Sequence, residues 1–185
     1  MKAGILALQG DFREHARMFA DAGATPVEVR TPDDLEQVDC LALPGGESTT
    51  ISKLARHHGL VEPIRQRAAG GMPVLGTCAG MILMASEVED GEPLLALMDL
   101  GVRRNAYGRQ VDSFEADVEV REVGRVRAVF IRAPQVRRVG DEVAVLAEHG
   151  GVPVVVRQAN LLAASFHPEI AGDSRLHRRL LELAG

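Results

Sequence analysis

The first half of the chain alternates short aliphatic runs with segments of helical periodicity, and this alternation constrains the fold more than any other feature. The runs cover residues 3–8, 27–29, 40–43 and 73–76. The first is almost entirely aliphatic, as expected for a strand buried on both faces. Strands joined by helices through short links form parallel β–α–β units. The sequence therefore predicts an α/β fold of three layers, with a mostly parallel, doubly wound sheet.

Capping signals mark where the helices begin. Asp11 precedes an amphipathic segment, so we expect its side chain to cap a helix. Ser48 or Thr49 is expected to cap the helix that follows the third aliphatic run. A compact apolar helix is predicted over residues 79–85, and an amphipathic helix over residues 174–184 closes the chain.

The second half of the chain has a different pattern. Residues from about 102 to 156 alternate apolar and polar side chains with few helical stretches. This alternation predicts antiparallel hairpins added to the parallel core. Residues 161–166 return as a buried strand. Because no repeat, low-complexity segment or linker interrupts the sequence, we expect a single domain over residues 1–185.

Composition excludes several classes of protein. The 21 Lys and Arg residues against 26 Asp and Glu give a formal charge of −5, which makes a poor generic binder of nucleic acid. No apolar segment is long enough for a membrane helix, and the start lacks a signal peptide. Cys40 and Cys78 form neither a disulfide framework nor a zinc site by number or spacing. The chain is therefore expected to be cytoplasmic, with reduced thiols.

The histidines and Cys40 offer little further chemistry. Cys40 lies inside an aliphatic run and is expected to be a small core residue. His57 and His58 are adjacent, so they point to different faces of a helix. His149 and His177 are expected on the surface. The sequence thus predicts no metal site, and no dinucleotide-binding fingerprint follows the first strand.

The strongest local signal is a Gly-x-Cys-x-Gly sequence around Cys78, between a predicted strand and a predicted helix. It is the nucleophile-elbow pattern with cysteine as nucleophile, in which Gly76 and Gly80 permit a sharp turn. The helix N-terminus favours a thiolate, and the Ala79 amide would face a developing oxyanion. A small buried residue in a glycine-rich turn would give the same pattern.

A general base is suggested by His167 and Glu169, which flank Pro168 just after the last predicted strand. In an extended segment, residues two apart project to the same side, so the carboxylate lies beside the imidazole. Pro168 disfavours helix at His167. A carboxylate on one ring nitrogen leaves the other to handle the thiol proton. Alone, this segment would be an ordinary surface turn.

A third element, residues 43–49, follows another predicted strand and contains Gly45 and Gly46. Adjacent glycines let backbone amides approach a ligand closely. A tight turn capped by Ser48 would explain this segment equally well. Carboxyl ends of parallel strands meet at one edge of a sheet, where such folds keep their sites. Three such elements at three strand ends favour a catalytic site.

Together these elements resemble the triad (class I) glutamine amidotransferases, whose fold is flavodoxin-like. Within that superfamily the chain is most similar to the glutaminase subunits of pyridoxal phosphate synthases. The resemblance runs from residue 4 to about residue 170, and Tyr107 stands where many members have Phe. It is carried by residues 7–10 (Ala-Leu-Gln-Gly), 14–15 (Glu-His), 43–50 (Leu-Pro-Gly-Gly-Glu-Ser-Thr-Thr), 76–81 (Gly-Thr-Cys-Ala-Gly-Met), 104–110 (Arg-Asn-Ala-Tyr-Gly-Arg-Gln), 130–134 (Phe-Ile-Arg-Ala-Pro) and 165–169 (Ser-Phe-His-Pro-Glu).

The resemblance implies a role for each matched residue. Cys78 would attack the side-chain amide of glutamine, with His167 as general base and then acid. Glu169 would orient His167, and amides around Gly46 and Ala79 would form the oxyanion hole. A cation such as Arg104 suits the substrate α-carboxylate. The matched glutamine-binding residues are Gly46, Glu47, Ser48, Arg104, Ile131 and Arg132.

The resemblance also implies a partner but no cofactor and no metal. Ammonia would pass to a barrel-shaped synthase subunit that makes pyridoxal phosphate from a pentose phosphate and a triose phosphate, in a large hetero-oligomer. Gln9, Gly10, Glu14 and His15 are candidates for sensing the docked partner, although helix capping explains them equally well.

Three alternatives remain. Another glutaminase, such as that of imidazole glycerol phosphate synthase, should differ in its loop and elbow. Cysteine hydrolases and stress proteins of the DJ-1/PfpI type tend to carry a His after the nucleophile, where this chain has Ala79. A non-catalytic scaffold of the same fold would usually have lost one of Cys78, His167 and Glu169.

Overall fold

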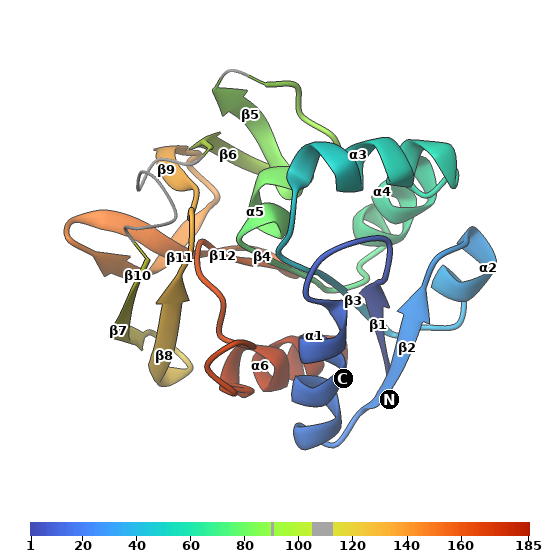
Figure 1. Cartoon of the computed structure of the whole chain (residues 1–185), viewed down its shortest axis with the longest axis horizontal. Helices are drawn as coiled ribbons and strands as arrows, with labels where there is room; N and C mark the ends of the chain where they lie inside the picture. The colour runs from blue at the N-terminus through green and yellow to red at the C-terminus, as the bar shows by residue number, and fades with distance from the viewer. Residues whose placement is uncertain (90, 105–112) are drawn as a thin grey trace.

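The computed structural model describes residues 1–89, 91–104 and 113–185 and places a central sheet between two further layers (Figure 1). The sheet has seven strands in the order β10-β11-β12-β4-β3-β1-β2. In chain order these are β1 (Lys2–Leu6), β2 (Thr25–Val29), β3 (Cys40–Leu43), β4 (Val74–Thr77), β10 (Ala144–His149), β11 (Val152–Gln158) and β12 (Leu161–Ala164).

Five neighbouring strands of this sheet, from β12 to β2, are parallel, and β11 and β10 are added antiparallel at one edge. The chain winds outward from β1 to β2 and then reverses to β3 on the other side of β1. Such a reversal is the point where open α/β sheets bind ligands, outside the carboxyl ends of the strands. The predicted α/β class and doubly wound order are confirmed.

Helices cover both faces of the sheet (Figure 1). One face carries α1 (Phe12–Asp21) and α6 (Arg175–Ala184). The other carries α3 (Ser48–His57), α4 (Val61–Ala69) and α5 (Ala79–Met84). The short α2 (Pro32–Leu35) follows β2 and begins at a capping box formed by Thr31 and Asp34.

Two apolar clusters fill the space between the layers, one on each face of the sheet. Phe19 of α1, Leu176 of α6 and Phe166 belong to the first cluster. Ile51 of α3 and Met81 of α5 belong to the second. Each helix thus buries one apolar stripe against the sheet, as its periodicity predicts.

The second half of the chain adds two smaller sheets. The hairpin of β7 (Phe114–Val120) and β8 (Gly124–Phe130) is antiparallel, as the alternation predicted. The other sheet joins β5 (Ala85–Glu89), β6 (Met98–Arg103) and β9 (Gln135–Val139). The pairing of β5 with β6 is parallel, which the sequence analysis did not foresee.

Both capping predictions were wrong in their details. Asp11 occupies the N-cap of α1 but makes no side-chain cap, because its carboxylate turns toward His167 instead. The helix α3 is capped by Glu47, not by Ser48 or Thr49. The longer side chain of Glu47 reaches both the Thr49 amide, at 3.1 Å, and the Thr50 amide, at 2.7 Å.

In the residues that the structure describes, no helix has the length and apolar character that a bilayer crossing requires.

Gly76 permits the close contact between β4 and α5. A Cβ atom on Gly76 would lie 2.6 Å from the carbonyl carbon of Gly80 and 2.6 Å from the sulfur of Met84. The helix therefore approaches the strand more closely than a side chain at residue 76 would allow.

We expect Gly76→Ala to lower the free energy of unfolding by about 2 kcal/mol, because the backbone of α5 must shift to admit the methyl group. Gly70→Ala is the matched control, since its Cβ would meet the Gln66 carbonyl oxygen at 3.3 Å and Gly70 has negative φ. The control should stay within about 0.5 kcal/mol of the parent chain. Urea unfolding followed by circular dichroism measures both, and equal stabilities would contradict the packing argument.

Candidate active site

Four segments that leave the carboxyl ends of β1, β3, β4 and β12 meet around one cavity of about 480 Å³. They bring Asp11, Gly46, Cys78 and His167 to the same edge of the sheet, although these residues span most of the sequence. Of the site residues predicted from sequence, all but Glu169 line this cavity. Those that line it are Gly46, Glu47, Ser48, Cys78, Ala79, Arg104, Ile131, Arg132 and His167.

Cys78 sits on a strained turn between β4 and α5. Its φ of 47° and ψ of −106° lie outside the conformations that non-glycine residues ordinarily adopt. The amide of Cys78 donates to the carbonyl of Ala164 at 2.9 Å, which continues the pairing of β4 with β12. This geometry is that of a nucleophile elbow, in which backbone strain holds the reactive side chain out of the sheet.

His167 is held from its backbone and from its ring. Its amide donates to the carbonyl of Val129 in β8 at 2.8 Å, so the added hairpin anchors this segment. Ring Nδ1 lies 2.6 Å from Glu169 Oε1, as the two-residue spacing predicted. The two residues are only 4% and 3% exposed. The charge-assisted bond fixes one ring nitrogen and leaves Nε2 for a reaction partner.

Asp11 is a site residue that the sequence analysis assigned only to helix capping. Its Oδ2 lies 3.3 Å from His167 Nδ1, on the same ring nitrogen that Glu169 contacts. The hydrogen bond with His167 lowers the pKa of Asp11, although partial burial opposes this. An acidic residue just past the end of a predicted parallel strand is a signal that could have pointed to the site, but the sequence analysis did not use it.

The surroundings of His167 favour the imidazolium form. Burial alone would lower the pKa of His167, but hydrogen bonds to Asp11, Cys78 and Glu169 outweigh it and raise the pKa to about 12. A protonated ring beside the Cys78 sulfur stabilises a thiolate, because the two charges compensate each other in a desolvated site.

The same three groups raise the question of a metal ion. Atoms of Asp11, His167 and Glu169 lie within 4.8 Å of one another. The distance of 2.6 Å between His167 Nδ1 and Glu169 Oε1 is that of a direct hydrogen bond. A metal bound to both atoms, at about 2.1 Å from each, would hold them further apart. The cluster is therefore organised around a shared proton.

The loop after β3 is held by hydrogen bonds on both sides. The side-chain oxygen of Gln9 accepts from the amide of Glu47 at 2.8 Å. The Glu47 carboxylate accepts from the Thr50 hydroxyl and from the Thr49 and Thr50 amides. The Thr50 hydroxyl is the largest influence that lowers the pKa of Glu47 to about 2.

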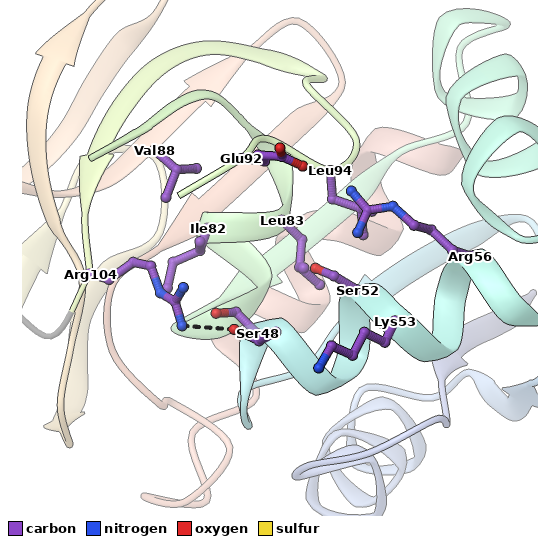
Figure 2. A pocket seen from close by; sticks show the side chains of 11 residues that line it. Ser48, Ser52, Lys53, Arg56, Ile82, Leu83, Val88, Glu92, Leu94 and Arg104 are labelled. Carbon is purple, nitrogen blue, oxygen red and sulfur yellow. Dashed lines mark hydrogen bonds between the residues drawn. The ribbon is translucent and has the colours of Figure 1, made fainter. Parts of the chain in front are cut away.

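Arg104 closes one side of the cavity. Its guanidinium donates to the Thr49 hydroxyl at 3.0 Å and lies 3.5 Å from Glu47 Oε1. Figure 2 shows Arg104 reaching toward the start of α3 beside Ile82, where it also borders a smaller hollow of about 210 Å³. Its cationic group is thus positioned over a cavity large enough for an amino acid.

The segment after β8 also lies against Cys78. The thiol of Cys78 lies 3.8 Å from the carbonyl oxygen of Ile131. Arg132 has a φ of 47°, a conformation that L side chains rarely adopt. Strained backbone of this kind persists where a site needs a particular geometry.

Three further predictions can be compared with the structure. His177 was expected on the surface, which is wrong, because α6 packs it into the core at 0% exposure. His15, expected to sense a docked partner, is also fully buried. Cys40 lies in the core as predicted, and burial raises its pKa to about 12. Residues 105–110 of the resemblance lie outside the described part of the chain.

The comparisons with known proteins agree with this geometry. The model of the SNO glutamine amidotransferase family matches residues 5–183. A relative from Frankia alni, named pyridoxal 5'-phosphate synthase subunit PdxT, is 56% identical, covering 98% of this chain and 94% of its own. A PdxT subunit from Streptomyces avermitilis is also 56% identical, over 97% and 92%. A crystal structure described as a glutamine amidotransferase is 51% identical, with a TM-score of 0.95 over 99% of this chain and 98% of its own.

We expect iodoacetamide to alkylate Cys78 about tenfold faster in the parent chain than in His167→Gln at pH 7. The imidazolium of His167 is present at this pH because its pKa is raised to about 12, so it supplies a positive charge beside the sulfur. The glutamine side chain of the variant carries no such charge. Mass spectrometry measures the labelling.

Cys78→Ala is the control for this experiment, since Cys78 lines the cavity whereas Cys40 is 0% exposed in the core and should not react. Equal alkylation rates in the parent chain and in His167→Gln would rule out the thiolate–imidazolium pair.

Proposed function

The chain belongs to the SNO glutamine amidotransferase family, and we propose that it hydrolyses L-glutamine to L-glutamate and ammonia at the Cys78 site. It is the glutaminase subunit of a pyridoxal phosphate synthase, which its PdxT relatives support. The observation that carries the proposed chemistry is the strained Cys78 turn beside a His167 ring bound to Glu169 at 2.6 Å. Residues 1–185 act as one cytoplasmic domain.

The first half of the reaction forms a glutamyl thioester. The Cys78 thiolate attacks the side-chain carbonyl carbon of glutamine, and the carbonyl oxygen becomes an oxyanion. Backbone amides at Gly46 and Ala79 stabilise this charge. His167 then donates its proton to the leaving nitrogen, the carbon–nitrogen bond breaks, and ammonia departs.

The second half hydrolyses the thioester. Neutral His167 takes a proton from water, and the hydroxide attacks the thioester carbon through a second oxyanion. Glutamate leaves as the carbon–sulfur bond breaks, which restores the thiolate and the imidazolium. Glu169 holds the ring in one orientation in both halves, and Asp11 adds a second carboxylate that favours the protonated ring.

Glutamine is held by the walls of the cavity. Arg104 pairs with the α-carboxylate, for which a planar guanidinium is well suited. The Glu47 carboxylate and the Ser48 side chain border the same space, and Ile131 and Arg132 close it opposite α3. The exposed side chain of Ile170 also lines the cavity.

Ammonia passes to a separate synthase subunit. The relatives are named as subunits of that synthase, which supports a partnership in a hetero-oligomer. The buried position of His15 removes it from a docking surface. Gln9 remains suited to report docking, because its side chain holds the amide next to Gly46 and lies on the loop after β1.

Glutamate release is the direct test of the function. The purified chain, alone and mixed with the synthase subunit, should release glutamate from glutamine, with higher turnover in the mixture. Cys78→Ala should lower turnover by at least about a thousandfold, because the nucleophile is lost. Absence of glutamate release in both conditions, from folded protein and an active synthase, would exclude the glutaminase function.

Neighbouring arginines allow a test of the substrate contact. Arg104→Met should raise the KM for glutamine about a hundredfold, because a charge-assisted contact to the carboxylate is lost, with a smaller effect on kcat. Arg103→Met is the matched control, since that side chain is 52% exposed and pairs only loosely with Glu89 at 4.0 Å. Equal KM values for the two variants would assign the carboxylate to another residue.

A further inference from the structure

Two buried histidines lie directly behind the triad and are not used in the mechanism above. His15 belongs to α1 and His177 to α6, and both are 0% exposed. His15 Nδ1 lies 2.7 Å from His177 Nε2, a direct hydrogen bond between the rings. On its other side His15 Nε2 lies 3.0 Å from the Thr77 hydroxyl and 3.7 Å from Glu169 Oε2.

This arrangement connects the pair to both ends of the triad. Thr77 is the last residue of β4 and immediately precedes Cys78. Glu169 uses Oε1 to bind His167, and its buried Oε2 has no hydrogen-bond partner within the described residues. His15 Nε2 lies 3.7 Å from that second oxygen.

Both histidines are neutral near pH 7. Burial is the main influence on each, lowering the pKa of His15 to about 4 and that of His177 to about 3. For His15 the negative charges of Glu169 and Asp11 oppose this shift, while His177 and His167 reinforce it. Around His177 the neighbouring rings are His15 and Phe19. A neutral imidazole carries one N–H, so each ring exists as one of two tautomers.

The surroundings of the pair select one tautomer. If His15 Nδ1 carried the proton, it would donate to His177 Nε2. His177 would then have to carry its proton on Nδ1. That nitrogen is buried without a hydrogen-bond partner in the described structure. A buried N–H without an acceptor is costly. In addition, the bare lone pair of His15 Nε2 would then face the Glu169 carboxylate.

The other tautomer removes both problems. His177 Nε2–H donates to His15 Nδ1, and His15 Nε2–H donates to the Thr77 hydroxyl with its positive end toward Glu169 Oε2. The unpartnered His177 Nδ1 is then only a lone pair. Each N–H in the chain of hydrogen bonds points toward the triad, so the pair presents a fixed dipole to a buried negative charge.

We propose that His15 and His177 are positioning residues of the glutaminase, which orient an N–H toward Glu169 and thereby hold the Glu169 carboxylate against His167. The inference rests on the proposed function, because it assigns the pair a role in the Cys78 reaction. It predicts that removing the donor at His15 Nε2 weakens catalysis while the cavity that binds glutamine is unchanged.

The test compares variants of His15 in the complex with the synthase subunit. His15→Met removes the donor at similar volume, whereas His15→Gln keeps an amide N–H near the position of Nε2. We expect His15→Met to lower kcat about tenfold with KM within about twofold of the parent chain, and His15→Gln to recover most of kcat. His58→Met, on the exposed end of α3, is the matched control and should leave both constants unchanged.

Alkylation of Cys78 gives a second readout that does not depend on turnover. His15→Met should slow the reaction with iodoacetamide at pH 6 about tenfold, because a displaced carboxylate no longer stabilises the imidazolium, and His15→Gln should restore the rate. If His15→Met does not fold, His15→Asn replaces it. The shorter amide of Asn reaches the Nδ1 position but not Nε2, so its alkylation should also be slow.

The outcomes separate the inference from the function on which it rests. The positioning role is overturned if the parent chain is an active glutaminase and folded His15→Gln has the same kcat and the same alkylation rate as His15→Met or His15→Asn. The two histidines would then have only a structural role. An inactive parent chain would reject the proposed function, while the alkylation rates would still decide whether the pair acts on Cys78 through Glu169 and His167.

Discussion

The close packing of α5 on β3 and β4 is the constraint on which the rest of the site depends. Gly76 and Gly80 lack side chains at the contact, so the helix begins immediately after the strand and Cys78 must adopt a strained conformation with positive φ. That conformation holds the thiol at the carboxyl edge of the sheet. A wider separation between strand and helix would allow an ordinary turn and would place the sulfur elsewhere.

A second constraint is electrostatic. His167 is buried, which by itself disfavours a charged ring, yet two carboxylates contact its Nδ1 and a thiol lies on the cavity side. The energetic cost of burying these groups is offset only when they are charged together. The neutral histidine pair lies behind Glu169, where α1 and α6 pack together, and its hydrogen bonds reach Thr77 at the end of β4.

Much of the fold and the proximity of the proposed triad residues were predictable because the relevant signals are local. Aliphatic runs, a glycine-flanked cysteine and a two-residue spacing between His167 and Glu169 each follow from backbone geometry over a few residues. The capping of α3 by Glu47 was missed because the prediction favoured short side chains at the N-cap. The role of Asp11 was missed because a capping acid and a site acid occupy the same position just before α1.

The sequence by itself determined the parallel sheet and the strand ends that carry the candidate site, and it singled out the residues proposed as nucleophile, base and orienting acid. All of these depend on side-chain periodicity and short-range sterics. Only the tertiary structure decided that Asp11 shares the ring nitrogen with Glu169, and that His15 and His177 meet in the core. The physical reason is that these contacts join segments up to 162 residues apart in the sequence, and their partners are set by how the helices pack on the sheet.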